Sequence, residues 1–138
     1  MEIKKQSITY KNGTQKLLSI GAGCVIFKNG KVLLVRGKGG TKFKFPGGHV
    51  DDEETIHQSA IREAEEEVDV KVEILGQPYL YLFQFSESTD VILFSYLSKI
   101  ISGTPKAHTE IEEIGWFERD NLPDVFDNVA PTLDFFQK

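Results

Sequence analysis

Two apolar runs on either side of a tight-turn sequence limit the fold of this chain more than any other feature. The runs SIGAGCVIF and KVLLVRG are rich in β-branched and large apolar residues, which favour strands. Between them stand Lys28, Asn29 and Gly30, and Asn-Gly between two such runs is the strongest short-range signal for a β-hairpin. The sequence therefore predicts a hairpin over residues 19–37.

The remaining segments predict more strands and only two helices. Strand composition recurs in KFKF, VKVEIL, YLYLFQF, DVILFSYLSKI and EIGWF. One helix is predicted from Thr55 to Val68, and a short second helix is predicted to begin near Ala130 and Pro131, where proline suits the first turn. Many strands and few helices indicate an α+β sandwich, and the lack of repeats or linkers predicts a single domain over residues 1–138.

Composition limits the class of protein. At 138 residues the chain can bury roughly two-thirds of the surface that its unfolded form exposes. Its one cysteine, Cys24, lies in an apolar run, which predicts a buried, inert thiol. The segment MEIKKQSITYKNG has no apolar core of signal-peptide length, and no stretch approaches the ~20 apolar residues of a membrane span. We therefore expect a soluble cytoplasmic protein with no membrane partner.

Charge is divided unevenly along the chain. No acidic residue lies between Ile3 and Val50, where ten of the sixteen Lys and Arg residues stand. Residues 48–70 then carry nine Asp and Glu residues against the single base Arg62. A protein that binds duplex nucleic acid gains nothing from an adjoining acidic block, which phosphates repel. A small phosphorylated ligand together with a divalent cation requires both signs of charge.

Residues 60–67, AIREAEEE, concentrate acids on the predicted helix. At about 100° per residue, its apolar side consists of His57, Ile61, Ala64 and Val68. Glu63, Glu66 and Glu67 fall within an arc of roughly 100° directed away from that side, and Glu65 points elsewhere. Like charges three or four residues apart destabilise a helix by a few tenths of a kcal/mol per pair. A solvated helix face is the alternative, but a bound cation would compensate the repulsion.

A glycine-rich bend precedes this helix. In FPGGHVDDEE, Pro46, Gly47 and Gly48 permit a tight turn whose backbone no side chain shields, so its carbonyl groups can face a metal ion. An ordinary turn is the alternative interpretation of Gly-Gly alone.

Bend and helix together spell GHVDDEETIHQSAIREAEEEVDV, which resembles the Nudix box G-x(5)-E-x(7)-R-E-U-x-E-E-x-G-U, where U is a bulky aliphatic residue. The matching positions are Gly48, Glu54, Arg62, Glu63, Glu66, Glu67 and Val70. Ala64 is smaller than the usual aliphatic residue, and Asp69 replaces a glycine that suits a left-handed helix end, a conformation that Asp tolerates better than most residues do. EIEEIGWFERDNLP also resembles the family.

This resemblance implies a Nudix-type α/β/α sandwich with a mixed β-sheet and a loop-helix-loop motif. It also implies hydrolysis of a nucleoside diphosphate linked to another moiety, with Mg²⁺ or Mn²⁺ bound and water attacking phosphorus. Such hard ions prefer oxygen ligands. We expect Glu66 and Glu67 as primary ligands, Glu63 as the third and the Gly47 carbonyl as a weaker one.

Other roles follow from the same resemblance. Arg62 is expected to orient a glutamate through a bidentate pair, and Glu54 to support the helix start or the metal network. The general base is expected to be Glu63 or a glutamate of the later loop TEIEEIGW, where we rank Glu110 above Glu112 and Glu113, as the base or an additional metal ligand. For each of these loop residues the alternative is a solvated surface acid.

Substrate contacts are expected from the basic half of the chain. Arg36 is the foremost candidate for phosphate, and the backbone at Gly48 is a further one. The other basic candidates are Lys38, Lys42 and Lys44, and for any single lysine the alternative is a solvated surface position. Phe43, Tyr79, Tyr81 and Trp116 are candidates to stack on a base, and each is equally compatible with the core or a strand surface.

Three functions are compatible with the box. The first is a pyrophosphohydrolase, for which the small size of the chain favours a compact substrate such as a nucleoside triphosphate. The second is a Nudix-fold module that senses a nucleotide without turnover, and the third is an isomerase acting on a diphosphate. YLYLFQF offers an apolar strand through which the chain could form a homodimer.

Overall fold

The computed structural model describes residues 5–137. Its strands are β1 (Lys5–Thr9), β2 (Gln15–Lys28), β3 (Lys31–Gly37), β4 (Gly47–His49), β5 (Lys71–Ile74), β6 (Tyr79–Gln84), β7 (Thr89–Ser102) and β8 (Ile111–Phe117). Its helices are α1 (Ile56–Val68) and α2 (Val129–Phe136), and a 3-10 turn, η1, spans Arg119–Asn121. Within residues 5–137, no helix has both the length and the apolar character needed to cross a membrane.

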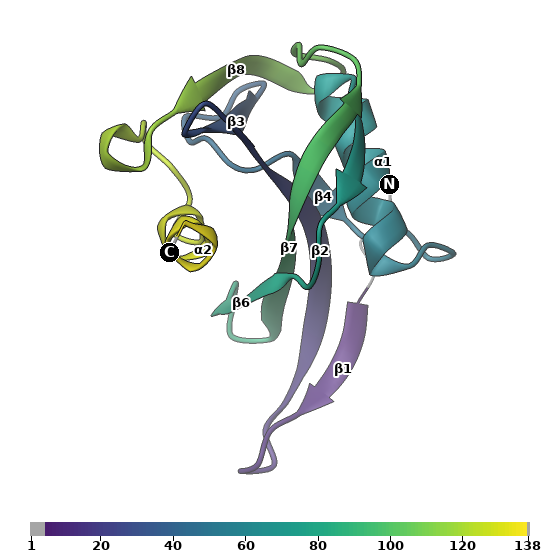
Figure 1. Cartoon of the computed structure of the whole chain (residues 1–138). Helices are drawn as coiled ribbons and strands as arrows, with labels where there is room; N and C mark the ends of the chain where they lie inside the picture. Colours follow the sequence, from purple (N-terminus) through teal and green to yellow (C-terminus); the bar gives the residue numbers. More distant parts are fainter. Residues whose placement is uncertain (1–4, 138) are drawn as a thin grey trace.

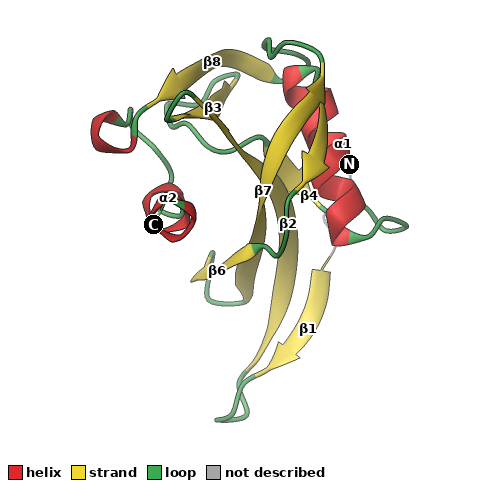
Figure 2. Cartoon of the chain, in the orientation of Figure 1, coloured by secondary structure: helices red, strands yellow, loops and turns green. Residues whose placement is uncertain are grey.

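The strands form one mixed sheet in the order β5-β7-β2-β3-β8, with β1 and β4 also paired to β2 and β6 paired to β7. The two longest strands, β2 and β7, run parallel, whereas the other pairs are antiparallel. Helices α1 and α2 lie on opposite sides of these central strands (Figure 1). The expected sandwich with a mixed sheet is thereby confirmed, and its few helices among many strands are plain in Figure 2.

The predicted hairpin is confirmed. Strands β2 and β3 pair antiparallel at their joined ends, with Phe27 opposite Val32 and Lys28 opposite Lys31. Asn29 and Gly30 form the turn with φ angles of 52° and 77°. Both values are positive, as the favoured two-residue hairpin turn requires.

Both faces of β2 and β3 are buried over residues 21–26 and 32–35, which explains the unbroken apolar sequences there. Alternate β2 residues, including Cys24 and Ile26, pack with Ala60 and Ala64 of α1. Val25, on the other face, belongs to a second cluster. That cluster combines Val32 and Leu34 of β3 with Val129 and Leu133 of α2. A strand buried on two sides has no polar face to maintain.

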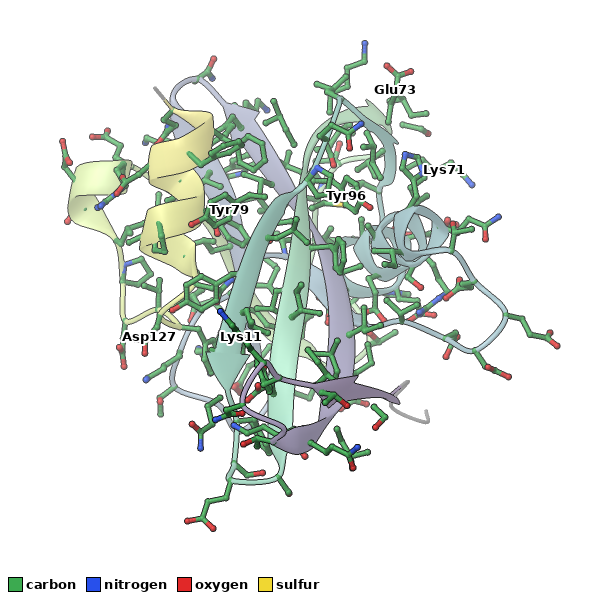
Figure 3. All side chains as sticks on the ribbon, turned by 90° about the horizontal axis from the view of Figure 1, so that it is seen from below. Lys11, Lys71, Glu73, Tyr79, Tyr96 and Asp127 are labelled. Atoms are coloured by element: carbon green, nitrogen blue, oxygen red, sulfur yellow. The ribbon has the colours of Figure 1, made fainter. Side chains whose placement is uncertain are left out.

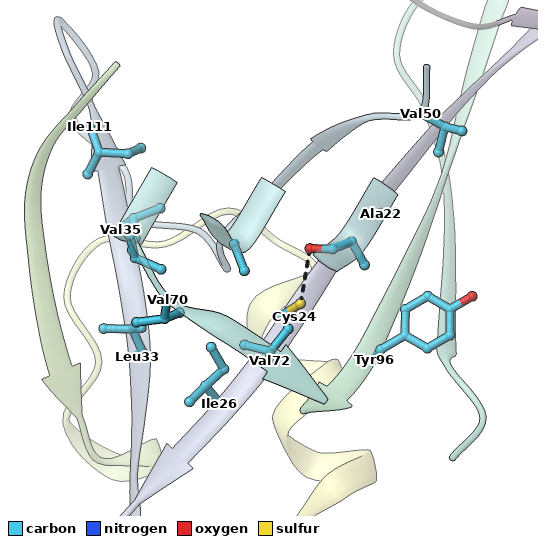
Figure 4. Packing of buried hydrophobic residues seen from close by; sticks show 13 residues of the cluster. Ala22, Cys24, Ile26, Leu33, Val35, Val50, Val70, Val72, Tyr96 and Ile111 are labelled. Atoms are coloured by element: carbon cyan, nitrogen blue, oxygen red, sulfur yellow. Dashed lines mark hydrogen bonds between the residues drawn. The ribbon is translucent and has the colours of Figure 1, made fainter. Parts of the chain in front are cut away.

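Cys24 is the buried thiol that the sequence predicts. It is 0% exposed in the α1-side core, and its Sγ donates to the Ala60 carbonyl at 3.3 Å (Figure 4). Burial raises the pKa of the thiol to about 11, because the thiolate would lose its hydration. Cys24 is therefore unreactive at neutral pH.

Helix α1 has defined ends. Thr55 caps its start through a capping box with Gln58, with backbone-to-side-chain distances of 3.0 Å in both directions. Asp69 ends it in the left-handed conformation, at φ 58° and ψ 41°, and donates its N–H to the Glu65 carbonyl. The aspartate thus takes the conformation of the glycine that it replaces in the box.

The orientation of α1 differs from the predicted one. His57 is exposed and its ring packs edge-on against Tyr96, while Ala60 replaces it among the buried residues and Glu63 is buried as well. Small alanines let the helix approach β2 closely, which turns the Glu63 side of the helix toward the sheet. Periodicity gives the angles between residues of one helix, but the neighbouring strand determines which residue faces it.

Several strand boundaries also differ. KFKF is not a strand, since Phe43 and Lys44 form only isolated bridges, with Val125 and Val35 respectively. Strands β1 and β4 are not evident from sequence patterns, and β8 begins at Ile111, before the predicted EIGWF. These segments depend on partners distant in the chain rather than on their own composition.

Candidate active site

A cavity of about 720 Å³ opens beside the middle of β2. Its charged end is lined by the Gly47 and Gly48 bend, by Glu63, Glu66 and Glu67 of α1, and by Glu110. Its other end is lined by β7 and by β6 beyond it, which both lie on the edge of β2 opposite to β4, and by the residues before α2. The cavity therefore joins the acidic helix face to a largely apolar surface.

Arg62 holds the glutamates of α1 in place. Its Nε lies 2.8 and 2.9 Å from the two carboxylate oxygens of Glu54. Its Nη1 donates to Glu63 at 3.1 Å and to Glu66 at 3.0 Å. Charge-assisted bonds of this kind are the strong class of hydrogen bond. One guanidinium therefore offsets much of the repulsion along the helix before any other cation is considered.

The pKa values around Arg62 reflect these contacts. The hydrogen bond from Arg62 is the largest cause that lowers the pKa of Glu54, and a bond from the Ser59 hydroxyl at 2.8 Å acts in the same direction. Burial by itself lowers the pKa of Arg62, but the bonds to Glu54 and Glu66 outweigh it and raise the pKa overall. Both groups are thus fixed in their charged forms at neutral pH.

Glu63 lies directly beneath Gly48 and is only 4% exposed. A Cβ atom at position 48 would stand 2.7 Å from its Oε1, so any residue other than glycine would displace the carboxylate. Burial, followed by the charge of Glu67, raises the pKa of Glu63, and Arg62 partly opposes this. The glycine of the bend therefore leaves room for a buried carboxylate.

Gly47 and Glu67 face a common point. The Gly47 N–H donates to Glu67 Oε1 at 2.9 Å. The Lys44 ammonium donates to the Gly47 carbonyl at 2.6 Å and to the two Glu67 oxygens at 3.0 and 3.2 Å. Carbonyl and carboxylate oxygens that surround one cationic group are also suitable donors for a hard divalent ion.

The carboxylates of Glu63, Glu66 and Glu67 are held in ion pairs at this site. Within residues 5–137, no three His, Cys, Asp or Glu side chains converge in metal-binding geometry. The carboxylates of Glu63 and Glu66 point instead to Arg62, and that of Glu67 points to Lys44. The carboxylate and carbonyl oxygens are nevertheless the donors that Mg²⁺ requires, and the Lys44 ammonium shows that they accept from a cation.

A loop from β7 closes the C-terminal end of α1 and brings Glu110 to the cavity. The last carbonyls of a helix lack partners within it. Here the Lys106 N–H donates to Val68 and the His108 N–H to Glu67, both at 3.1 Å. The Glu66 carbonyl accepts from the Thr109 hydroxyl at 3.0 Å and lies 2.9 Å from His108 Nδ1. Glu110 follows directly and lines the cavity with an exposed side chain.

Arg36, in contrast, is not brought to this site. It pairs with Glu112 at 2.8 Å and Glu113 at 3.0 Å, donates to the Gly40 carbonyl at 3.0 Å, and does not line the cavity. These contacts account for it as a structural ion pair on β3 and β8. Lys44 is the phosphate candidate that the structure does place at the cavity.

Aromatic residues of β6 line the opposite end. The strand alternates, with Tyr81 and Phe83 half-buried toward the cavity and Leu80 and Leu82 exposed. The rings of Tyr81 and Phe83 lie 5.9 Å apart. Tyr81 is thus the stacking candidate that reaches the cavity.

The other aromatic candidates have structural contacts elsewhere. Phe43 packs edge-on against Phe117 in the α2-side core, with ring centroids 5.2 Å apart. Tyr79 packs against Phe135 of α2 at 5.0 Å, beside that helix in Figure 3. Trp116 does not line the cavity.

The sequence analysis missed the residues before α2. Phe126, Asp127 and Asn128 line the cavity, and Figure 3 shows Asp127 next to α2. Asn128 stands at the N-cap position but makes no side-chain capping bond. An Asp-Asn pair before a helix is a typical start signal, so the sequence gives no reason to assign it to a ligand.

A mixed sheet between two helices, with a carboxylate-rich helix after a Gly-Gly bend, forms the loop-helix-loop arrangement that the Nudix box implies. A protein-family model described as NUDIX domain matches residues 17–136. The chain therefore belongs to the Nudix family and is a pyrophosphohydrolase. Members of this family generally use divalent metal ions and act on small nucleotide substrates.

Individual relatives agree with this assignment. An 8-oxo-dGTP diphosphatase of Haemophilus influenzae is 33% identical over 113 residues, which cover 78% of this chain and 81% of that protein. An ADP-ribose pyrophosphatase of Methanocaldococcus jannaschii is 27% identical over 118 residues, covering 82% and 70%. The crystal structure of a UDP-X diphosphatase shares the fold, with a TM-score of 0.77 at 21% identity over 86% of this chain. The chain spans 60% of the length of that protein.

Proposed function

We propose that this protein hydrolyses a nucleoside triphosphate or a similarly compact nucleoside diphosphate derivative, with Mg²⁺ or Mn²⁺ as cofactor. One observation carries the proposal: a single cavity of about 720 Å³ has acidic residues at one end and aromatic residues at the other. Pockets of this size hold small ligands. A nucleotide has the matching division into a phosphate chain and a flat base.

Glu66 and Glu67 would be the main metal ligands, with Glu63 and the Gly47 carbonyl completing the oxygen donors. A bound divalent ion supplies neutralisation of phosphate charge and a lower pKa for water. The short contacts of the Lys44 ammonium with Gly47 and Glu67 support this assignment, because the same oxygens already accept from a positively charged group.

The side chains of the chain itself would orient the reaction. Arg62 would keep Glu54, Glu63 and Glu66 in fixed positions, so that little rearrangement is needed when substrate binds. Glu110 would accept the proton of the attacking water. Its carboxylate is exposed to the cavity and forms no ion pair with any residue in the described part of the chain, so it is available for that role.

The base would occupy the aromatic end. Tyr81, Phe83 and Phe126 offer ring faces for stacking. Asp127 and the Asn128 amide add hydrogen-bonding groups for the edge of a base. The similarity to the 8-oxo-dGTP diphosphatase of Haemophilus influenzae favours a nucleoside triphosphate. The similarity to the ADP-ribose pyrophosphatase of Methanocaldococcus jannaschii makes ADP-ribose a second substrate to test.

Incubation with Mg²⁺ and a panel of nucleoside triphosphates, ADP-ribose, dinucleoside polyphosphates and nucleotide sugars tests the proposal. We expect a nucleoside monophosphate and pyrophosphate, identified by product mass, from triphosphates with the wild type but not with Glu67→Gln. Binding without any product would support the sensing module instead. An isomerised diphosphate would support the isomerase.

A further inference from the structure

The position of the Lys44 ammonium is unusual for a residue expected to receive phosphate. Its Nζ points to the bend, 2.6 Å from the Gly47 carbonyl oxygen and 3.0 Å from Glu67 Oε1. A longer contact of 3.4 Å reaches the Phe45 carbonyl. The oxygens of Gly47, Glu67 and Phe45 are all hard donors, and the Lys44 ammonium already lies among them.

Two of these groups are the ones proposed to hold the metal ion. Metal ligands approach Mg²⁺ to about 2.1 Å, and an ammonium group approaches oxygen to about 2.8 Å. Two cations that share the Gly47 carbonyl and the Glu67 carboxylate would stand close enough for strong mutual repulsion. The ammonium and a divalent ion therefore exclude one another at this point.

Only the side chain of Lys44 is free to move. Its backbone is fixed to Val35 by two hydrogen bonds, N–H to carbonyl in each direction, both of 2.8 Å. The side chain is 33% exposed and lines the cavity. When the ammonium leaves Gly47 and Glu67, its flexible stem can carry it into the adjoining cavity, where the phosphate chain would lie.

We infer that Lys44 is a built-in cation that occupies the Gly47 and Glu67 position in the metal-free protein and yields it to a divalent ion. The displaced ammonium then contacts the substrate phosphates. This inference rests on the proposed metal site. Lys44 would thereby couple the binding of the metal ion to the binding of the nucleotide. Metal binding must first break the ion pair of the ammonium with Glu67 and its hydrogen bond to Gly47, and a bound nucleotide gives the released ammonium a new partner.

Lys42 provides the matched control. It lines the same cavity and carries the same charge. Its Nζ lies over the Phe126 ring at 5.8 Å and, within residues 5–137, forms no ion pair with the glutamates of α1. Removal of the Lys42 charge therefore reports the general electrostatic effect of one lysine at the cavity, without the local competition.

The experiment is a titration with Mn²⁺, followed by electron paramagnetic resonance without nucleotide, on the wild type, Lys44→Met, Lys42→Met and Glu67→Gln. We expect the Kd of Lys44→Met to fall by about tenfold, as for the loss of one charge-assisted competitor, and that of Lys42→Met to change by less than about twofold. We also expect Lys44→Met to lower the Tm in EDTA, and a nonhydrolysable triphosphate to tighten Mn²⁺ binding less in this variant than in the wild type.

A Kd for Lys44→Met equal to or weaker than that of the wild type overturns the inference, as does an equal gain in Lys42→Met. Lys44→Gln replaces Lys44→Met if the methionine variant does not fold. Failure of the metal site itself has a different signature, since the wild type and Glu67→Gln would then bind Mn²⁺ equally. If Glu67→Gln loses binding and Lys44→Met gains none, the metal site stands and the role of Lys44 does not.

Discussion

Arg62 and Glu54 are joined across the first turns of α1 by two contacts from a single nitrogen, Nε, at 2.8 and 2.9 Å from the carboxylate oxygens. The Nη1 atom of the same guanidinium faces Glu63 and Glu66, and its Nη2 lies 3.4 Å from the His49 carbonyl oxygen. A residue just before the helix cap and a residue near the middle of the helix together fix the direction of the acidic side chains.

We predict that Arg62→Lys reduces kcat by about 10- to 100-fold, the range for loss of a group that orients metal ligands, because an ammonium cannot reach three carboxylates in the same geometry. Steady-state kinetics measure kcat, and thermal unfolding checks that the variant is folded. Arg119→Lys is the control, since Arg119 forms a comparable pair with Asp134, at 2.7 and 3.2 Å, away from the cavity. Equal losses in both variants would contradict the orienting role.

Gly48→Ala should impair the site through sterics alone. The new Cβ atom would lie 2.7 to 2.8 Å from the Glu63 carboxylate, so we expect a loss of about 1–3 kcal/mol in the free energy of unfolding and a large fall in turnover. Gly37→Ala is the control, because its Cβ would meet only the Glu110 carbonyl at an ordinary 3.8 Å. Denaturant unfolding measures this loss. A wild-type free energy of unfolding for Gly48→Ala would show that the space at Gly48 is not required.

Glu110→Gln tests the general base. If Glu110 accepts the proton of water, kcat at saturating Mg²⁺ should fall by about 10²- to 10⁴-fold and lose its dependence on a deprotonated group at low pH. Glu112→Gln is the control, since Glu112 pairs with Arg36 outside the cavity. Glu63→Gln is measured in parallel across the pH series. Wild-type kcat and pH dependence in Glu110→Gln, with both lost in Glu63→Gln, would place the base inside the box.

Tyr81→Ala should raise KM for the nucleotide with little effect on kcat, because stacking on a base contributes about 1–3 kcal/mol to binding. Leu80→Ala is the matched control, since Leu80 is the adjacent residue on the outer face of β6. Binding of a nonhydrolysable triphosphate, measured by calorimetry, checks the same difference without turnover. The proposed base position is wrong if the two variants bind alike.

Asp90 predicts a pH dependence of stability that is separate from the site. The Tyr10 hydroxyl donates to its carboxylate, and Lys16 lies 3.3 Å away; the Tyr10 bond is the largest cause that lowers the pKa of Asp90. A carboxylate with a lowered pKa stabilises the folded state above its unfolded pKa, about 3.9, and that contribution is lost as pH falls through the lower folded value.

Asp90→Asn should therefore lower the Tm near pH 7, and the difference from the wild type should shrink below about pH 4. Thermal unfolding at a series of pH values measures it. A Tm difference for Asp90→Asn that is constant with pH would contradict the assigned cause.

Local features of this protein were set by local sequence. Asn29 and Gly30 determine the hairpin turn, because few residues adopt two consecutive positive φ angles. Thr55 and Asp69 bound α1 through contacts within one turn of each end. The spacing from Gly48 to Glu67 also identifies the family, since a fixed spacing on one loop and helix fixes which groups share a face.

Contacts between distant segments needed the tertiary structure. Arg36 is held away from the cavity by two glutamates of β8. The position of Lys44 depends on an isolated bridge to Val35 and on the Glu67 carboxylate, 23 residues away in the chain. KFKF has the composition of a strand, yet no continuous partner runs beside it.

The two ends of the cavity show the same division. Except for Glu110, its acidic end follows from residues close in sequence. Tyr81 and Asn128 line the same cavity only because β6 and α2 are assembled around the parallel pair of β2 and β7. The burial of Glu63 and the exposure of His57 likewise depend on how α1 is rotated against β2. Sequence periodicity fixes angles within an element, and only packing between elements fixes which way that element faces.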